Sequence, residues 1–314
     1  MKTGITSIVT SMMISMPFMT LAAEKVDKTL AVTASPSINI EVKRGDVSIK
    51  SWDKNQVQVI GTLDDYSEGL IFKKRGNSIT IEDKVEQRID LSGKAGSKLK
   101  IMVPKKLRLD AEGVSTDFDV SKLSGDIRVS SVSGDIDAKS LQGSPELKSI
   151  SGEINANDLS GEIQLSSVSG QLNDKNSKGS IRYNAVSGDL NAHTQASHIE
   201  IQQVSGQLNG DFSMAKSLQI KLVSGDAKFS VNGDINSLKA QSVSGDVMVK
   251  FSKLPDANVE IDGGPGGDIQ NKLTQDKPKK ARYTGAESLD ITIGKGTANI
   301  RMDTISGDLI LMVK

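Results

Sequence analysis

The sequence predicts an all-β fold: a single-stranded parallel β-solenoid, of the β-helix or β-roll kind, with two-strand coils of ~18 residues and irregular β caps. Three observations lead to this prediction. Apolar residues alternate with polar ones, glycine occurs twice in each period, and a Val-Ser-Gly or Ile-Ser-Gly phrase recurs at a spacing of 18 and later 19 and 20 residues. The phrase begins at Val114, Val132, Ile150, Val168, Val186, Val204, Val223, Val243 and, after an irregular stretch, Ile305.

The alternation within each period indicates strands with one buried face. Ile136, Ile154 and Leu172 stand 18 residues apart, and Ala138 and Ala156 follow the first two by two positions. A spacing of two is typical of a half-buried strand, and the 3.6-residue rhythm of a helix is absent. Like residues fall into columns if each period forms one coil that hydrogen-bonds to the next at about 4.8 Å. Stability then comes from stacking of neighbouring coils and from caps at the ends.

The repeated glycines are expected at the corners between strands. A corner needs either a positive φ or a close approach of two backbone segments, and glycine satisfies both requirements. The predicted structural corners are Gly125, Gly134, Gly143, Gly152, Gly161, Gly170, Gly179, Gly188, Gly206, Gly225, Gly245 and Gly307.

Polar residues also form columns. Stacked Asn side chains can bond amide to amide along a solenoid, and we take one such ladder as the candidate binding face: Asp137, Asn155, Asn173, Asn191 and Asn209. A second column follows a corner glycine and mixes acids with Gln, which dilutes the repulsion between stacked carboxylates: Asp135, Glu153, Gln171, Asp189, Gln207, Asp226 and Asp246.

Two residues interrupt the apolar columns. Asp174 stands in the small-apolar column, and we interpret it as part of a local bulge over residues 174–176, with a functional buried acid as the alternative. Pro145 stands in an Ile column and is expected to remove one hydrogen-bond donor from the ladder.

The chain divides into four parts. Residues 1–23 have the layout of a cleaved secretory signal peptide: a positive start at Lys2, an apolar stretch and the small residues Ala22 and Ala23. Residues 24–112 are expected to form an N-terminal β region that caps the solenoid. Residues 113–255 contain the regular coils of 18–20 residues, and residues 256–314 a loop followed by C-terminal β coils or a cap.

Composition excludes several classes of protein. The 39 basic and 39 acidic residues leave no positive surplus for a nucleic-acid partner. The absence of Cys excludes disulfides, thiolate metal sites, cysteine nucleophiles and a lipid-modified cysteine anchor. No stretch after the signal peptide is long and apolar enough to span a membrane.

Three stretches together resemble a known family. They are Leu99–Lys105 before the coils, the 18-residue coils with their Ser-Gly-Asp corners, and the closing stretches 296–300 and 305–309. Over residues 37–314 the chain is similar to the bacterial "putative adhesin" family, a domain-of-unknown-function group of exported β-solenoid proteins. The resemblance implies surface attachment and brings no ligand or catalytic residue. Gln171 and Gln207 depart from the acidic form of the corner.

Candidate chemistry is sparse, and we expect no catalytic, cofactor-binding or metal-binding residues. His193 and His198, the two histidines, are interpreted as exposed loop residues. Weak calcium binding at the Gly-Asp corners stays open, although the double-Gly nonapeptide of calcium β-rolls is absent. A polysaccharide-active β-helix enzyme with paired carboxylates is the lesser alternative, since the chain has a single Trp and three Tyr.

The leading hypothesis is an exported, non-enzymatic solenoid that acts as an adhesin or binds a surface or partner through its stacked polar ladders. The alternative is a soluble periplasmic structural or envelope-stress protein that binds another envelope protein. The expected partner is therefore an envelope protein or a surface glycan, and the periplasm is favoured over the cell surface. An open terminal coil is a sticky edge, so the ends are expected either to be capped or to pair into an end-to-end or edge dimer.

Overall fold

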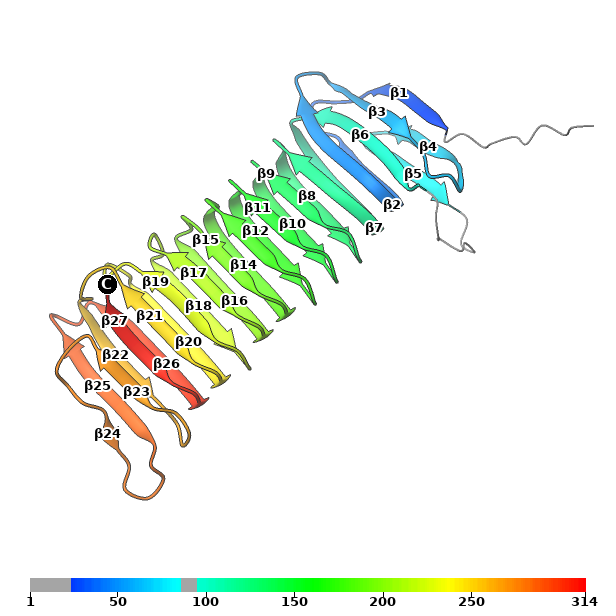
Figure 1. Cartoon of the computed structure of the whole chain (residues 1–314). Coiled ribbons are helices and arrows are strands. Elements are labelled where there is room, and N and C mark those ends of the chain that lie inside the picture. The colour runs from blue at the N-terminus through cyan, green and yellow to red at the C-terminus, as the bar shows by residue number, and fades with distance from the viewer. Residues whose placement is uncertain (1–23, 86–94) are drawn as a thin grey trace, which may run out of the picture.

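The protein is a long β rod. The computed structural model describes residues 24–85 and 95–314, and the predicted signal peptide lies outside these ranges. All regular structure in the described ranges is strand, and 27 strands join into one continuous sheet. The sheet winds into coils stacked along one axis, with the N-terminal strands at one end of the rod and the C-terminal strands at the other (Figure 1). The predicted all-β parallel solenoid is confirmed.

Each central coil contributes one longer strand to one wall of the rod. These strands are parallel and in register, so that Leu147 lies opposite Leu165, and Leu165 opposite Tyr183. We call the outward side of this wall the long-strand face. Its central strands are β8 (Ser124–Ser131), β10 (Gln142–Ser149), β12 (Ser160–Ser167), β14 (Lys178–Ser187), β16 (His198–Ser205), β18 (Ser217–Leu222) and β20 (Ser237–Ser244).

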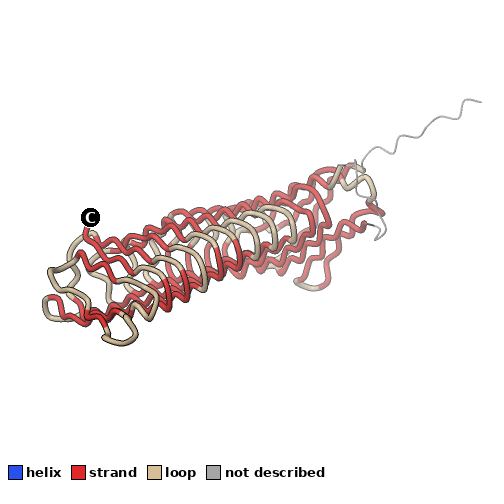
Figure 2. Tube along the Cα trace, turned by 60° about the horizontal axis from the view of Figure 1, so that its bottom comes forward, coloured by secondary structure: helices blue, strands red, loops and turns tan. Residues whose placement is uncertain are grey.

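The shorter strands form a second wall, the short-strand face, which is also parallel and in register. Repeated loops join the two walls along the rod (Figure 2). The central short strands are β9 (Ile136–Lys139), β11 (Ile154–Asn157), β13 (Leu172–Lys175), β15 (Leu190–His193), β17 (Leu208–Phe212), β19 (Ala227–Val231) and β21 (Val247–Phe251).

The core lies between the walls. Ile136, Ile154 and Leu172 are fully buried and stack directly on one another, as their 18-residue spacing predicts. Small residues of the next inward column, such as Ala138 and Ala156, leave room for larger side chains from the opposite wall. Burial of every second side chain on both walls explains why these sequences form strands.

At the N-terminal end the coils do not follow the order of the chain. The long strand β2 pairs in parallel with β7 along nearly its whole length, and on its other side with β5 and β6. Antiparallel strands then close the end, with β4 on β5, β3 on β6 and β1 on β3. The strands are β1 (Lys25–Ala31), β2 (Ser37–Trp52), β3 (Gln56–Thr62), β4 (Ser67–Arg75), β5 (Ser78–Val85), β6 (Ser97–Pro104) and β7 (Lys106–Ser121).

The C-terminal end shows a similar change of order. The last two strands, β26 and β27, insert between the coil of β20 and β21 and the coil of β22 and β23. The antiparallel strands β25 and β24 close this end. The strands are β22 (Ala257–Asp262), β23 (Ile269–Lys272), β24 (Lys279–Lys280), β25 (Glu287–Ile293), β26 (Ala298–Ser306) and β27 (Leu309–Val313). The boundaries predicted at 112/113 and 255/256, and the end-to-end or edge dimer, stay predictions.

The two interruptions of the columns have different outcomes. Pairing of β10 with β12 is interrupted at Ser144 and Pro145 and resumes at Glu146, which confirms the predicted loss of a ladder donor. The bulge predicted at Asp174 is wrong, because Asp174 pairs in register between Ala156 and Ala192. The strand stays regular because hydrogen bonds inside the core satisfy this carboxylate.

Over the two described ranges, no helix has the length and apolar character needed to cross a membrane.

Candidate functional site

The predicted corner glycines lie at the bends of the coils. Nine of the twelve have a positive φ: Gly125, Gly143, Gly161, Gly179, Gly188, Gly206, Gly225, Gly245 and Gly307. Gly134, Gly152 and Gly170 do not, and there the close approach of the neighbouring coil excludes a side chain. A Cβ on Gly170 would lie 1.9 Å from the carbonyl oxygen of Gly152.

The residue three positions before the glycine distinguishes these two kinds of corner. The buried Ser167 Oγ accepts a hydrogen bond from the Gly170 N–H at 2.8 Å, and Ser149 and Ser131 bond Gly152 and Gly134 in the same way. Ala185 stands at the equivalent position of the next coil and brings no hydroxyl. Its glycine, Gly188, adopts a φ of 135°.

The acidic column at the corners is part of the scaffold. Asp135 Oδ1 accepts the backbone N–H of Glu153, one coil further on, at 2.8 Å. Asp189 accepts the N–H of Gln207 in the same way at 2.9 Å. Each acid therefore satisfies a backbone donor that the turn leaves outside the strand ladder. This gives the Gly-Asp corner a structural reason that requires no calcium ion.

The predicted Asn ladder lies on the short-strand face. Nδ2 of Asn173 donates to Oδ1 of Asn155 at 3.1 Å, Asn191 donates to Asn173 at 3.1 Å, and Asn209 donates to Asn191 at 3.4 Å. Asp137 precedes them in the same register and is exposed. Because the amides bond to one another, part of their hydrogen-bonding capacity is used within the rod.

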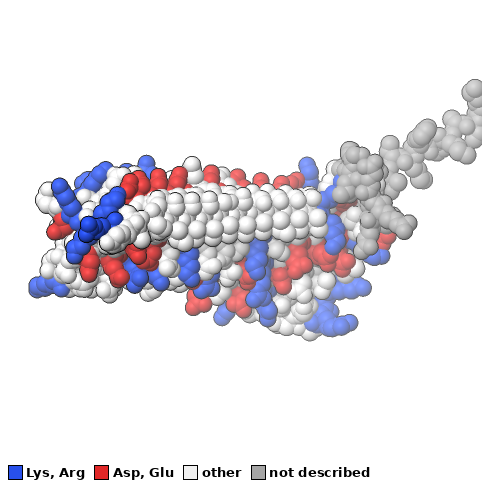
Figure 3. Space-filling model, turned by 90° about the horizontal axis from the view of Figure 1, so that it is seen from below, with Lys and Arg blue, Asp and Glu red and all other residues white. Residues whose placement is uncertain are grey.

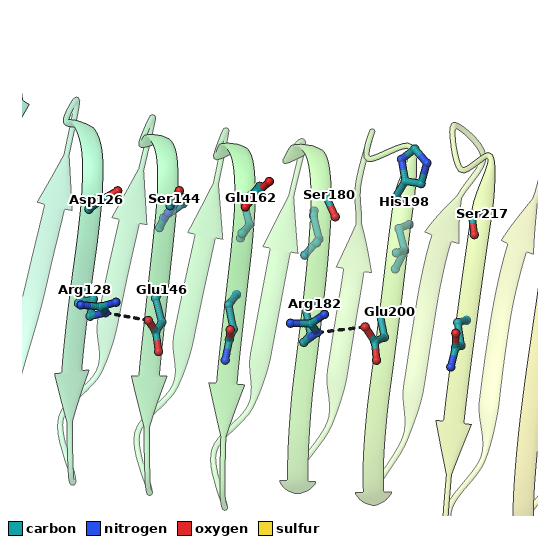
Figure 4. A pocket seen from close by; sticks show the side chains of 16 residues that line it. Asp126, Arg128, Ser144, Glu146, Glu162, Ser180, Arg182, His198, Glu200 and Ser217 are labelled. Carbon is teal, nitrogen blue, oxygen red and sulfur yellow. Dashed lines mark hydrogen bonds and ion pairs between the residues drawn. The ribbon is translucent and has the colours of Figure 1, made fainter.

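A second set of polar side chains lines a shallow groove of about 660 Å³ on the long-strand face. We call it the polar groove (Figure 4). Six consecutive coils, from β8 to β18, each contribute one residue to each of two outward rows. The first row is Asp126, Ser144, Glu162, Ser180, His198 and Ser217, and the second is Arg128, Glu146, Gln164, Arg182, Glu200 and Gln219.

The second row has a superperiod of three coils. Arg, Glu and Gln follow one another and then repeat in the same order, about 14 Å further along the rod. Within each repeat the Arg Nε donates to the Glu of the next coil, at 2.9 Å for Arg128 and Glu146 and at 3.0 Å for Arg182 and Glu200. The groove therefore presents two ion pairs with the same orientation, separated by uncharged Gln164.

These ion pairs hold their carboxylates in the ionised form. Hydrogen bonds from Lys148 and from Arg128 lower the pKa of Glu146. Hydrogen bonds from Gln202 and from Arg182 lower the pKa of Glu200. The groove therefore keeps both pairs charged over the neutral pH range, and each pair is exposed on its arginine side.

The most perturbed carboxyl lies away from any surface. Asp174 is 1% exposed; its Oδ1 accepts a hydrogen bond from Ser177 Oγ, and its Oδ2 accepts one from Tyr183 OH at 2.6 Å. Burial raises the pKa of Asp174 to about 6. Ser177 and Tyr183 are themselves fully buried. The carboxyl therefore joins the two walls inside the core and is not placed to touch a substrate.

The histidines lie at strand ends and are exposed. His193 ends β15 and His198 begins β16, where it belongs to the polar groove. Nδ1 of His198 lies 2.9 Å from the Ser197 hydroxyl. Among residues 24–85 and 95–314, no group of three or more His, Asp or Glu side chains is arranged to hold a metal ion.

Sequence reasoning missed the polar groove. The period of 18 placed its residues in columns, but the repeat of Arg, Glu and Gln only appears when outward positions are compared over three coils. Comparing the charge at residues 128, 146, 164, 182, 200 and 219 would have found it.

Comparison with known proteins places the chain in context. A family model described as Toastrack DUF4097 matches residues 36–216 and 212–311. No curated protein matches the sequence. A "putative adhesin" from Parabacteroides distasonis ATCC 8503 is 18% identical with a TM-score of 0.46, over 74% of this chain and 91% of that one. A "putative cell adhesion protein" from Clostridium sporogenes ATCC 15579 is 9% identical with a TM-score of 0.25, over 93% and 100%. These two overlays are loose, so the fold rests on the strand pairing and the family model.

Proposed function

The chain belongs to the Toastrack DUF4097 family, which confirms the resemblance found in its sequence, and we propose that it is an exported, non-enzymatic rod that binds an envelope partner along its polar groove. The three-coil superperiod of the groove carries this proposal. Two equivalent Arg–Glu pairs with equal spacing and orientation suit a partner that repeats its own charged groups. Two weak sites on one rigid support then act together, because binding of the first raises the effective concentration at the second.

Several features favour binding over catalysis. The one carboxyl with a strongly raised pKa, Asp174, is enclosed in the core. Acids of the corners, such as Asp135, use an oxygen to accept backbone N–H groups. The polar groove pairs its carboxylates with cations, which lowers their pKa and opposes a role as a general acid at neutral pH.

The chemistry of the groove favours a protein partner over a glycan. Its lining contains no aromatic ring and presents full charges of both signs. Partly exposed ion pairs of this kind give register and specificity at a protein interface. A surface glycan stays the second candidate, and the signal-peptide layout of residues 1–23 supports export in either case.

A binding experiment with matched variants tests this proposal. Residues 24–314 are purified and measured against isolated peptidoglycan, surface polysaccharide and solubilised envelope proteins. The groove variant is R128E/R182E, and the control K175E/K228E makes the same charge change on the exposed short-strand face. We expect the groove variant to lose at least about 10-fold in affinity, since it reverses both ion pairs, and the control to bind like the wild type. Equal binding by both variants, or no binding by the wild type to any of the three, would refute the role of the groove.

Location separates the two forms of the proposal. An adhesin must be exposed on the cell, whereas a periplasmic factor is released with the periplasm. We favour the periplasm, so protease added to intact cells should leave the chain uncut. Cleavage on intact cells would support the adhesin, and glycan cleavage that is lost with one Asp pair would support the enzyme alternative.

A further inference from the structure

The corner between the long and short strands carries a row of exposed aliphatic side chains. It consists of the first residue of each Val-Ser-Gly phrase from Val114 to Val243, followed by Ile305 of the inserted last coil. These nine side chains are between 39% and 56% exposed. We call this row the aliphatic ridge. Figure 3 shows a smooth band without charged side chains along this side of the rod.

The fold itself does not require the ridge. A half-exposed corner position tolerates polar residues, and the outward rows of the long-strand face vary freely among Asp, Ser, Glu and His. The ridge is nevertheless Val or Ile in all nine coils. Single exposed aliphatic residues are ordinary, but a continuous apolar row of this length marks an interaction surface.

A groove of matching length runs beside the ridge. It has a volume of about 740 Å³ and lies between ridge residues Val132 to Val223 and the outward residues at the ends of the long strands, such as Lys148 and Lys221. Its floor contains small side chains, including Ser149 and Ala185. The ridge and this ridge-side groove therefore share the same coil spacing of about 4.8 Å.

We propose that the ridge is the interface of a parallel homodimer, with a two-fold axis along the rod and the ridge of each copy in the ridge-side groove of the other. A second copy of this chain has the same coil spacing and twist along its whole length, so that every ridge residue meets an equivalent gap. A two-fold axis along the rod brings opposite edges of the two bands together, which places ridge against groove. Such an interface is isologous and closed.

Charge favours the parallel arrangement. Beyond the ridge lies the acidic column of the corners, which includes Glu153 and Asp226, and a row of acidic side chains borders the band in Figure 3. Beyond the groove lie Lys148 and Lys221. In the parallel dimer, Lys148 of one copy faces Glu153 of the other, and Lys221 faces Asp226. In an antiparallel dimer the two acidic columns would face each other, at a cost in electrostatic energy.

The available area suffices for a stable dimer. Nine half-exposed Val and Ile side chains and the serines beside them present roughly 700–800 Å² on each copy, which is the size of a standard protein interface. The polar groove lies nearer the start of the same long strands and stays open in this arrangement. The dimer would therefore hold two partner-binding grooves side by side, but it does not depend on the proposed function.

Sedimentation velocity of residues 24–314 tests the interface. We expect a dimer for the wild type and a monomer for V168K/V186K, whose dissociation constant should rise at least about 100-fold because two charges are buried on each copy. The control L254K changes an exposed aliphatic residue away from the ridge and should stay dimeric. Circular dichroism and the melting temperature show whether each variant is folded. A monomeric wild type overturns the proposal, and so does binding of that monomer to phosphatidylglycerol vesicles through the ridge.

Introduced cysteines test the orientation, since the natural chain has none. In the parallel dimer V132C and V243C, near opposite ends of the ridge, each lie beside the same residue of the other copy. Each variant alone should therefore form a disulfide-linked dimer under mild oxidation. A crosslink that forms only when V132C and V243C are mixed would show the antiparallel arrangement and overturn the parallel one. Failure of all three samples to crosslink would overturn the ridge as an interface.

Discussion

The buried Asp174 cluster allows the stacking of the coils to be tested by thermodynamics. In one coil, three inward positions are polar where the neighbouring coils are mostly apolar. Asp174 lies between Ala156 and Ala192, and its oxygens accept hydrogen bonds from Ser177 and Tyr183. The perturbation is pH, and the variant D174N removes the titrating group while keeping its size.

The magnitude follows from the pKa of Asp174, which burial raises from 3.8 to about 6. Between these values the folded protein still holds a proton that the unfolded chain has lost. The free energy of unfolding therefore falls as the pH rises from about 4 to about 6, by about 3 kcal/mol in all, and this contribution is constant above that window. The direction is opposite to that of an Asp stabilised by a salt bridge.

Urea denaturation followed by circular dichroism, from pH 4 to pH 7.5, measures this effect. The difference in unfolding free energy between wild type and D174N should change by about 3 kcal/mol across the window, in favour of D174N at high pH, because all other titrations cancel. The control D158N replaces an exposed acid of the same wall and should give a flat difference. A flat difference for D174N, or a change in the opposite direction, would show that Asp174 is not enclosed between its neighbours.

Three further changes probe the corners by thermal or urea denaturation. G161A should cost about 3 kcal/mol or more, because φ is +119° and the new Cβ would lie 2.0 Å from a backbone oxygen, whereas G285A, with a positive φ but open space, should cost about 1–2 kcal/mol; equal losses would contradict the close stacking. S167A should cost about 1–2 kcal/mol, because a buried N–H loses its acceptor; an unchanged stability would remove that bond. D135A should cost about 1 kcal/mol and D135N much less, because the amide oxygen still accepts the N–H of the next coil; equal effects would show that charge matters instead.

The period of 18 made much of the fold predictable, and its limits are equally physical. Columns such as Ile136, Ile154 and Leu172 could be read directly, because parallel stacking forces equivalent residues into contact. The order of the coils at both ends could not. Asp308 donates its N–H to Asp246 across 62 residues, and a column shows which residues are equivalent but not which coils are neighbours.

The candidate sites were predictable only where they repeat in every coil. The Asn ladder follows from one column, and its amide bonds are present. The aliphatic ridge was visible as the first letter of each phrase, but alternation of inward and outward residues assigns no side to a corner. Asp174 was assigned to a bulge because its partners, Ser177 and Tyr183, lie in other columns of the same coil, and only the structure brings the three together.

Site-specific photo-crosslinking in living cells tests the partner-binding role most directly. A photoreactive residue replaces Gln164, which lies between the two ion pairs of the polar groove, and a control replaces Lys175 on the short-strand face. We predict that Gln164 gives one dominant crosslinked product, that Lys175 does not, and that R128E/R182E abolishes it. The same products from both positions, or no product from Gln164, would contradict a partner seated in the groove.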